Sequence, residues 1–395
     1  MKRYDRITPE GTRDYVLKEC RLLRKADNIL RDLYQKYGYS EVITPSIEFY
    51  DVFSDGVGRV SQNELYTLTD SNGRLLTMRP DSTKPIARLY AAHLQKLELP
   101  LKLFYSQPVF KRNINFYKKS DEIMQTGVEL LGLNNFKSDI EIIMLSIKSM
   151  QLLFGDDFII EIGHMGFIKA LLDELDISAK LELRHAIATK NYPDLNRLAA
   201  LLGEKGEILK SLPELFGDST VLERAETLFS DSRSQEALKQ LKEVLAVLEQ
   251  NGLKDNVLVD LAVINDYEYY TGIVFKGFVK NESREILSGG RYDTLYNDYG
   301  LNVPAVGFAV NTDEAARLLV KKQRSKERET ERVAIYTDDP DLFKLQQLID
   351  SYSAKGVTSA ISLFDNIEDT LRWAQKIGAK KLVKIKDSVV SEVKL

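Results

Sequence analysis

The spacing of hydrophobic and polar residues predicts a helix followed by several hairpins in the first part of the chain. From Leu17 to Leu33, apolar residues recur at three- and four-residue steps, which is typical of an amphipathic helix. The segment SEVITPSIEFYDVF predicts a strand that Pro45 interrupts. LYTLTDSNGRLLTMRP and LKLFYSQPVFKRNINFYKKSDEIMQTGVELLG each predict two strands around a polar turn, with Asn72-Gly73 as a specific hairpin signal. Successive hairpins indicate an antiparallel sheet.

The pattern becomes helical over about residues 167–252 and then returns to strands. Strand-like segments resume in NVLVDLAVINDYEYYTGIVFKGFV and continue to VPAVGFAVNTDEAARLL. Neither half covers both faces of its core alone, so we expect these strands to join the first sheet and residues 1–320 to form one α+β domain with a helical insertion. A charged connector, residues 321–330, precedes residues 331–395, where alternating strands and helices predict a small α/β module with parallel strands.

Composition narrows the function classes. The 395 residues are 44% hydrophobic, as in ordinary globular proteins. The longest apolar runs are far shorter than the ~20 residues of a membrane span, and the N-terminus lacks the apolar core of a signal peptide, so we expect a cytoplasmic protein without membrane contact. The 55 basic and 59 acidic residues give a net charge of -4, and residues 331–395 carry ten of each. This balance disfavours a protein that grips nucleic acid.

Cysteine and histidine are too few for a metal centre. Cys20 is the single cysteine in the sequence, which excludes an internal disulfide and a thiolate cluster. The three histidines, His93, His164 and His185, show no paired spacing. We therefore expect neither a metal nor another cofactor.

Two polar clusters are candidates for a binding site. In MRPDSTKPIARL, a turn at Pro80 is expected to expose Arg79, Asp81, Thr83 and Arg88 beyond a strand end. In MQTGVELLG, the even spacing of Gln125 and Glu129 places both on one face of a strand. A ligand with an ammonium group and ring nitrogens would match these acids, but a surface ion-pair network fits the same residues.

The stretch VINDYEYYTG follows an apolar run and is rich in tyrosine. Tyrosine combines a flat apolar face with a hydroxyl that donates and accepts, which suits a binding pocket. Because tyrosine also favours strands, a half-exposed strand is the alternative.

Six segments in order resemble the catalytic domain of histidyl-tRNA synthetases. They are TPEGTRDY, YGYSEVITPSIEF, LTMRPDST, YSQPVFKR with MQTGVELLG, YEYYTGIVF, and SGGRYDTLYNDYG with PAVGFAV, and they run from about Thr8 to Leu318. The resemblance implies the class II aminoacyl-tRNA synthetase fold, an antiparallel sheet flanked by helices. It also implies dimerisation through the segment around Pro45.

The resemblance implies a histidine-binding site at matching positions. Carboxylates would hold the ammonium group and an imidazole N–H, and tyrosines would line the ring. For the carboxylate group of histidine, the resemblance implies one of two anchors. These are Lys111 together with Asn265, or Arg112 if its side chain turns inward. The implied histidine-binding residues are Asp81, Thr83, Lys111, Gln125, Glu129, Tyr269 and Tyr270.

The positions that would activate histidine depart from the synthetase pattern. Where the family places arginines and a glutamate that grip ATP and the amino-acid carboxylate, this chain has Lys111, Asn113, Ile114, Asn265 and Glu314. Adenylation requires fixed cations around the reacting phosphate, and loss of one stabilising donor typically costs about 2.7–4 kcal/mol in the transition state. The sequence therefore predicts no synthetase activity and no catalytic residue.

This chain keeps the amino-acid site of a synthetase but lacks the residues that act on the phosphates of ATP. In this combination it resembles the synthetase-like regulatory subunits of ATP phosphoribosyltransferase. That family implies a short-form ATP phosphoribosyltransferase catalytic subunit as partner, free histidine as feedback effector, and a homodimer within a hetero-oligomer. The alternatives are a drifted histidyl-tRNA synthetase and a synthetase-like enzyme that activates histidine for another acceptor. Histidine-dependent ATP–pyrophosphate exchange separates both from the regulatory subunit.

Overall fold

The computed structural model describes residues 4–113, 120–172, 177–263, 269–323, 331–337, 342–386 and 389–395. The chain divides into two compact units, residues 1–321 and residues 322–395. Among the described helices, none is both long enough and apolar enough to cross a membrane.

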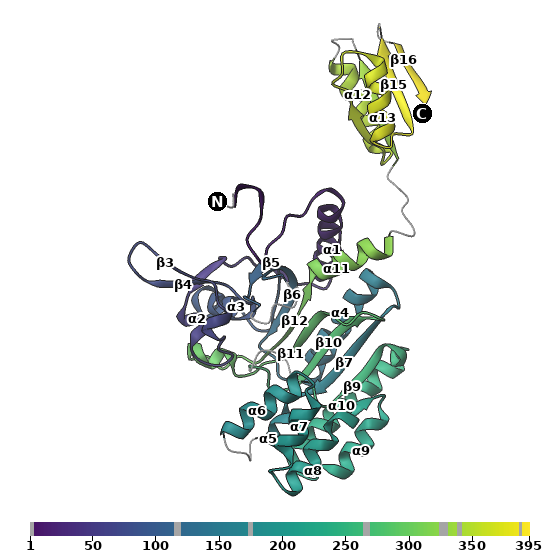
Figure 1. Cartoon of the computed structure of the whole chain (residues 1–395). Helices are drawn as coiled ribbons and strands as arrows, with labels where there is room; N and C mark the ends of the chain where they lie inside the picture. The colour runs from purple at the N-terminus through teal and green to yellow at the C-terminus, as the bar shows by residue number, and fades with distance from the viewer. Residues whose placement is uncertain are drawn as a thin grey trace. The chain divides into compact units, whose positions relative to one another are not determined.

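A nine-stranded sheet forms the centre of the first unit, in the order β1-β5-β6-β12-β11-β10-β7-β9-β8 (Figure 1). Neighbouring strands are antiparallel except for β1 with β5 and β7 with β9. The predicted antiparallel sheet is confirmed, and the later strands do join the first ones, because β12 lies between β6 and β11. The strands are β1 (Ser40–Glu41), β5 (Leu101–Phe110), β6 (Glu122–Leu131), β7 (Phe158–His164), β8 (Phe216–Gly217), β9 (Val257–Asp260), β10 (Ile273–Val279), β11 (Glu285–Arg291) and β12 (Ala305–Asn311).

Three long helices cover one face of this sheet. They are α1 (Leu17–Lys36), α4 (Phe136–Phe154) and α10 (Ser232–Gln250). The predicted helical spacing from Leu17 to Leu33 is confirmed, and it places Leu23, Leu30 and Leu33 in contact with the core. Strand residues alternate: Val128 and Leu130 of β6 pack towards the helices. The intervening positions of β6 therefore face the opposite side of the sheet.

The opposite face packs against the helix α3 (Thr83–Leu89), and an ion pair between Arg88 and Glu48 joins α3 to a small second sheet. That sheet has the order β2-β4-β3, with β2 (Ile47–Phe49), β3 (Thr67–Thr69) and β4 (Leu75–Met78), and the short helix α2 (Asp51–Ser54) follows β2. The hairpin predicted at Asn72-Gly73 is confirmed, since β3 and β4 pair antiparallel. Gly73 has a φ of +78°, a conformation that favours glycine.

The turn at Pro80 buries the side chains that we expected it to expose. Arg79 is 2% exposed and Asp81 is 3% exposed. Arg79 donates from Nη1 to the carbonyl oxygens of Thr44 at 2.6 Å and Pro45 at 2.9 Å, and from Nε to that of Pro108 at 2.7 Å. This guanidinium joins three segments distant in sequence, so the prediction of an exposed cluster is wrong at these two positions.

Helices make up most of the segment between β7 and β9. They are α5 (Met165–Leu172), α6 (Ile177–Ala188), α7 (Tyr192–Ala199), α8 (Glu204–Ser211), α9 (Thr220–Leu228) and α10. The short strand β8 lies within this segment and pairs with β9. After β12 comes α11 (Thr312–Gln323), which begins in the first unit and runs two residues past its boundary at Lys321.

The second unit is a four-stranded sheet, β14-β13-β15-β16, with one helix on each face. Its elements are β13 (Arg332–Thr337), α12 (Leu342–Ala354), β14 (Thr358–Ile361), α13 (Ile367–Lys376), β15 (Lys381–Lys386) and β16 (Val389–Lys394). Strands β14, β13 and β15 run parallel as predicted, whereas β16 runs antiparallel to β15. Only two residues of the sequence separate β15 from β16, which is too short a connection for a parallel crossover.

Candidate functional site

A cavity on the sheet face opposite α1 and α4, the tyrosine-lined cavity, brings together most of the predicted site residues. Six of the seven predicted histidine-binding residues line it, and Lys111 does not. The lining comes from the start of α3, from four neighbouring strands and from the segment before β10. It consists of Asp81, Ser82, Thr83, Tyr105, Gln125, Glu129, Tyr269, Tyr270, Ser288, Tyr292, Gly307, Phe308 and Ala309.

Glu129 is the buried carboxylate at the centre of this cavity. It is 2% exposed, and Thr83 Oγ1 donates to its Oε1 at 2.8 Å while the Tyr292 hydroxyl donates to its Oε2. Burial raises the pKa of Glu129 to about 8, against the lowering effect of these two hydrogen bonds. A Cβ added to Gly307, which pairs with Glu129 across the β6–β12 ladder, would lie 2.0 Å from Oε2. Glycine at this position makes room for the carboxylate.

Asp81 supplies a second buried carboxylate at the start of α3. Its Oδ1 accepts a hydrogen bond from the Lys84 backbone N–H at 3.0 Å. Its Oδ2 is buried and accepts no hydrogen bond from the described residues. Burial raises the pKa of Asp81 as well. A buried carboxylate oxygen without a donor is costly, so this site favours a ligand that brings N–H groups.

Three tyrosines form the aromatic wall. The rings of Tyr269 and Tyr270 are 4.8 Å apart between centroids, and Tyr292 lies 5.5 Å from the first and 6.4 Å from the second. Lys169 of α5 donates to the carbonyl oxygen of Tyr270 at 2.9 Å. Tyr269 and Tyr270 are 2% and 7% exposed, so the alternative of a half-exposed strand is wrong for this pair.

The cavity is narrow, with a volume of about 30 Å³. That volume corresponds to about one or two water molecules. An amino acid is much larger, so part of the lining must move when one binds.

Sequence reasoning missed Tyr105 and Tyr292. Tyr292 belongs to SGGRYDTLYNDYG, a segment that carried the resemblance, but nothing local shows that its hydroxyl reaches Glu129. Tyr105 lies over Gly127, where an added Cβ would be 2.6 Å from the tyrosine hydroxyl. The absence of side chains at Gly127 and Gly307 is the signal in the sequence that large groups occupy this face.

The described residues around the positions where the synthetase pattern binds phosphate either make other contacts or are exposed. Lys111 forms an ion pair with Glu64, with Nζ and Oε1 3.2 Å apart, and Arg112 is exposed. The Asn113 backbone N–H donates to Asp121 at 3.0 Å. Ile114 and Asn265 lie outside the described residues.

Glu314, at the start of α11, is held by two arginines. Its carboxylate lies 2.6 Å from Arg317 Nη2 and 3.3 Å from Arg284 Nη1, and its side chain is 8% exposed. The negative charge is therefore neutralised within the fold. Among the described residues, no group of three or more His, Cys, Asp or Glu side chains could hold a metal ion.

Comparisons with known proteins agree with this architecture. A family model described as histidyl-tRNA synthetase matches residues 11–315. An ATP phosphoribosyltransferase regulatory subunit of Bacillus cereus (strain AH820) is 35% identical over 399 residues, which cover 99% of this chain and 94% of the relative. One of Clostridium acetobutylicum is 35% identical over 372 residues, or 92% of this chain and 91% of the relative.

Solved structures are similar over nearly the whole chain. The crystal structure of an ATP phosphoribosyltransferase regulatory subunit/histidyl-tRNA synthetase from Bacillus halodurans has a TM-score of 0.85 and 26% identity, and the match covers 97% of this chain and 99% of that one. A histidyl-tRNA synthetase from Nostoc sp. PCC 7120 has a TM-score of 0.77 at 18% identity, covering 99% and 97%, which shows the fold alone.

Proposed function

The chain belongs to the histidyl-tRNA synthetase-like family of ATP phosphoribosyltransferase regulatory subunits, and from this premise we propose that free histidine binds in its tyrosine-lined cavity. Its function is that of a regulatory subunit of ATP phosphoribosyltransferase in histidine biosynthesis. The proposal adds a mechanism: the bound histidine is a feedback signal, and this chain catalyses no reaction itself.

The observation that carries the proposal is the pair of buried carboxylates beside three tyrosines. Asp81 Oδ2 accepts no hydrogen bond from the described residues, so it can accept one from the ammonium group of histidine. Glu129, fixed by Thr83 and Tyr292, can accept an imidazole N–H. Gln125 on the same strand face supplies an amide, and the tyrosines supply flat apolar surface for the ring.

Loss of phosphate chemistry supports a non-catalytic role. Lys111 is engaged by Glu64, and Glu314 stands where the synthetase pattern has an arginine. By sequence, Ile114 and Asn265 bring no charge. Neutralisation of a reacting triphosphate needs preorganised cations, and these positions do not supply them.

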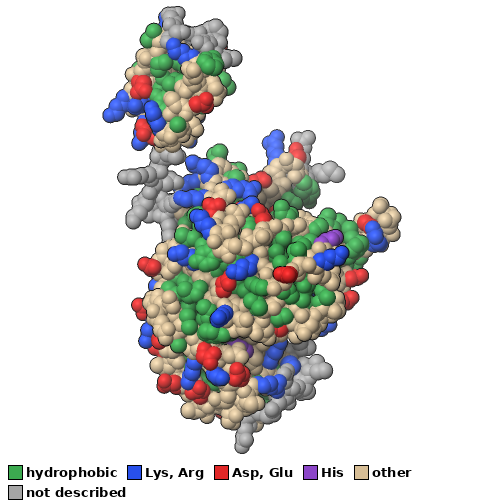
Figure 2. Space-filling model, turned by 180° about the vertical axis from the view of Figure 1, so that it is seen from behind, with side chains coloured by type: hydrophobic (Ala, Val, Ile, Leu, Met, Phe, Trp, Pro, Cys, Tyr) green, Lys and Arg blue, Asp and Glu red, His purple; other side chains and the backbone are tan. Residues whose placement is uncertain are grey.

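Exposed apolar side chains near β2 support a homodimer. Ile43 is 77% exposed, Ile47 is 44% exposed and Phe49 is 46% exposed, and Leu75 of the paired strand β4 is also exposed. Seen from behind, hydrophobic side chains gather over a broad part of the first unit (Figure 2). Several exposed apolar side chains on one part of a protein mark an interface, and we propose that a second copy of the chain covers those around β2.

The partner proposed for the dimer is the short-form catalytic subunit of ATP phosphoribosyltransferase. Co-expression and co-purification test this assembly, and phosphoribosyltransferase activity that depends on the present chain is the expected result. Histidine-dependent ATP–pyrophosphate exchange by the present chain alone would instead support an active histidine-activating enzyme. Absence of exchange, with activity in the mixture, supports the regulatory role.

A further inference from the structure

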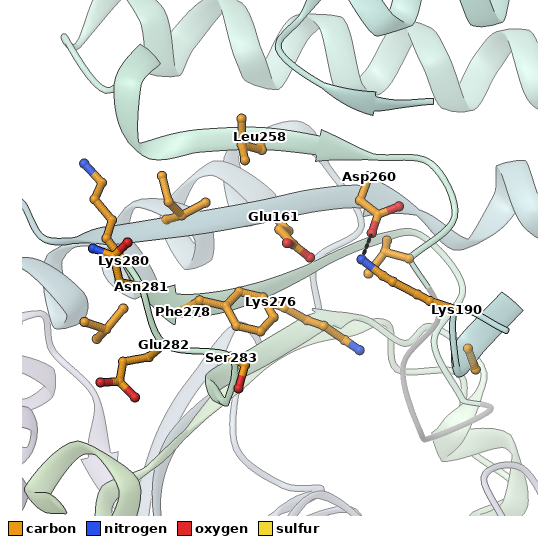
Figure 3. A pocket seen from close by; sticks show the side chains of 14 residues that line it. Glu161, Lys190, Leu258, Asp260, Lys276, Phe278, Lys280, Asn281, Glu282 and Ser283 are labelled. Atoms are coloured by element: carbon orange, nitrogen blue, oxygen red, sulfur yellow. Dashed lines mark ion pairs between the residues drawn. The ribbon is translucent and has the colours of Figure 1, made fainter. Parts of the chain in front are cut away.

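A second cavity lies on the same face of the sheet, over β7, β9 and β10 (Figure 3). Its volume is about 450 Å³, within the range of small-molecule sites. The turn after α6 and the turn between β10 and β11 form its walls. We call it the lysine-capped cavity, after Lys190 on its α6 wall. The regulatory role and the proposed histidine site make no use of it.

The floor of the lysine-capped cavity is apolar. Ile159 of β7 and Phe278 of β10 are paired across the antiparallel ladder, and Leu258 of β9 lies beside them. All three side chains are only partly buried, although their strands lie inside the sheet. An apolar floor that nothing in the described residues covers fully gains free energy when a ligand covers it.

Two carboxylates project from this floor. Glu161 of β7 pairs in register with Lys276 of β10, and Figure 3 shows its side chain near the middle of the cavity. Asp260, at the end of β9, is 2% exposed, and its Oδ1 accepts the Ala262 backbone N–H at 2.9 Å. The other oxygen, Oδ2, receives no hydrogen bond of good geometry from the described residues. Burial also raises the pKa of Glu161.

Lys190 places an ammonium group over these carboxylates. Its Nζ lies 3.2 Å from Asp260 Oδ2, as the dashed line in Figure 3 marks. The Lys190 side chain is 52% exposed, and its backbone has a φ of +50°, which a non-glycine residue adopts at a cost. A long, half-exposed lysine loses side-chain entropy when it is held in this way. The ammonium group of a ligand could therefore replace the Lys190 ammonium beside Asp260.

Of the other charged groups of the cavity, Lys280 is exposed, and Lys276 and Glu282 have ion-pair partners on β11 and α11. Lys276 pairs with Glu285 of β11 at 3.4 Å. Glu282, on the β10–β11 turn, pairs with Lys321 at 2.5 Å and Arg317 at 3.4 Å. The end near Asp260 and Glu161 is thus the part of the cavity that selects a ligand by charge.

We propose that the lysine-capped cavity binds a small organic cation, a primary amine on an apolar stem. The ammonium group displaces Lys190 and lies between Asp260 and Glu161. The apolar stem covers Leu258 and Phe278. This site is additional to the histidine site and does not depend on it.

Phenethylamine is a suitable probe, and phenylacetate is its control because it carries the opposite charge on a similar stem. Isothermal titration of the full chain should give a Kd for phenethylamine of about 1 mM or tighter, and no measurable binding of phenylacetate. Glu161→Gln and Asp260→Asn should each weaken binding of the amine at least about tenfold, a change of about 1.4 kcal/mol. Lys190→Met should tighten it several-fold, because the competing ammonium is gone.

Two matched variants locate the binding. Glu282→Gln changes a carboxylate of the same cavity that is paired away from the floor, and it should alter the Kd less than about twofold. Glu129→Gln disables the tyrosine-lined cavity and should also leave amine binding intact. Equal binding of phenylacetate, loss of amine binding in Glu129→Gln, or no amine binding to either the wild type or Lys190→Met would each overturn the proposal.

Discussion

The buried position of Glu129 predicts that histidine binding is coupled to proton release. Burial raises the pKa of Glu129 to about 8. At pH 7 the free protein therefore holds a proton on this carboxyl in about nine molecules out of ten. The ionised carboxylate accepts an imidazole N–H more strongly than the protonated carboxyl does, so we expect histidine binding to release this proton. Ionising Glu129 at pH 7 costs about 1.4 kcal/mol of binding free energy.

Because the pKa of Glu129 is raised, histidine affinity is expected to increase with pH. As pH rises towards 8, the free protein loses the proton itself, and the cost of ionisation falls. Histidine affinity should therefore increase about fivefold between pH 7 and pH 8, about 1 kcal/mol, and level off above the pKa. Isothermal titration in buffers with different ionisation enthalpies measures both the affinity and the number of protons released.

Tyr292→Phe is the matched control for this measurement. The Tyr292 hydroxyl donates to Glu129 and lowers its pKa, so the variant should bind histidine more weakly at pH 7 and level off at a higher pH. Ionisation of histidine itself is the same in both titrations. A wild-type affinity that is flat or falls from pH 7 to pH 8, or an identical pH profile in the variant, would refute the assignment of Glu129.

Three further predictions concern the site, the fold and the dimer. Gly307→Ala should abolish histidine binding measured by titration, because the added Cβ would lie 2.0 Å from Glu129 Oε2; retained binding would contradict this geometry. Arg79→Met should lower the free energy of unfolding in urea by about 3 kcal/mol or more, against about 0.5 kcal/mol for exposed Arg74→Met, and equal losses would contradict it. Ile43→Asp should yield monomers in sedimentation experiments, and an unchanged dimer would place the interface elsewhere.

Sequence patterns predicted the helices and turns that depend on neighbouring residues alone. The helical spacing that begins at Leu17 and the Asn72-Gly73 turn each depend on a few neighbouring residues, and both elements are observed. Strand alternation placed Gln125 and Glu129 on one face, and both line the tyrosine-lined cavity. From the polar cluster at Pro80, the resemblance to synthetases selected Asp81 and Thr83 as histidine-binding residues, and both line the same cavity.

Contacts between distant segments were not predictable from such patterns. Arg79 is buried because carbonyl groups of two other segments accept its hydrogen bonds. Glu314 has an arginine partner one turn away on its helix, but Arg284 lies 30 residues earlier in the chain. The hydroxyl of Tyr292, the residue that follows β11, reaches Glu129 of β6. Only the three-dimensional arrangement shows these partners.

The central claim is that this chain transmits a histidine signal from its tyrosine-lined cavity to the catalytic subunit. The most direct measurement is a histidine titration of ATP phosphoribosyltransferase activity in the assembled complex, with wild type, Glu129→Gln and the exposed control Glu243→Gln. We predict that histidine inhibits the wild type and the control at similar concentrations, whereas inhibition by histidine is lost or greatly weakened in Glu129→Gln. Unchanged inhibition in Glu129→Gln would contradict the account and place the effector site outside this cavity.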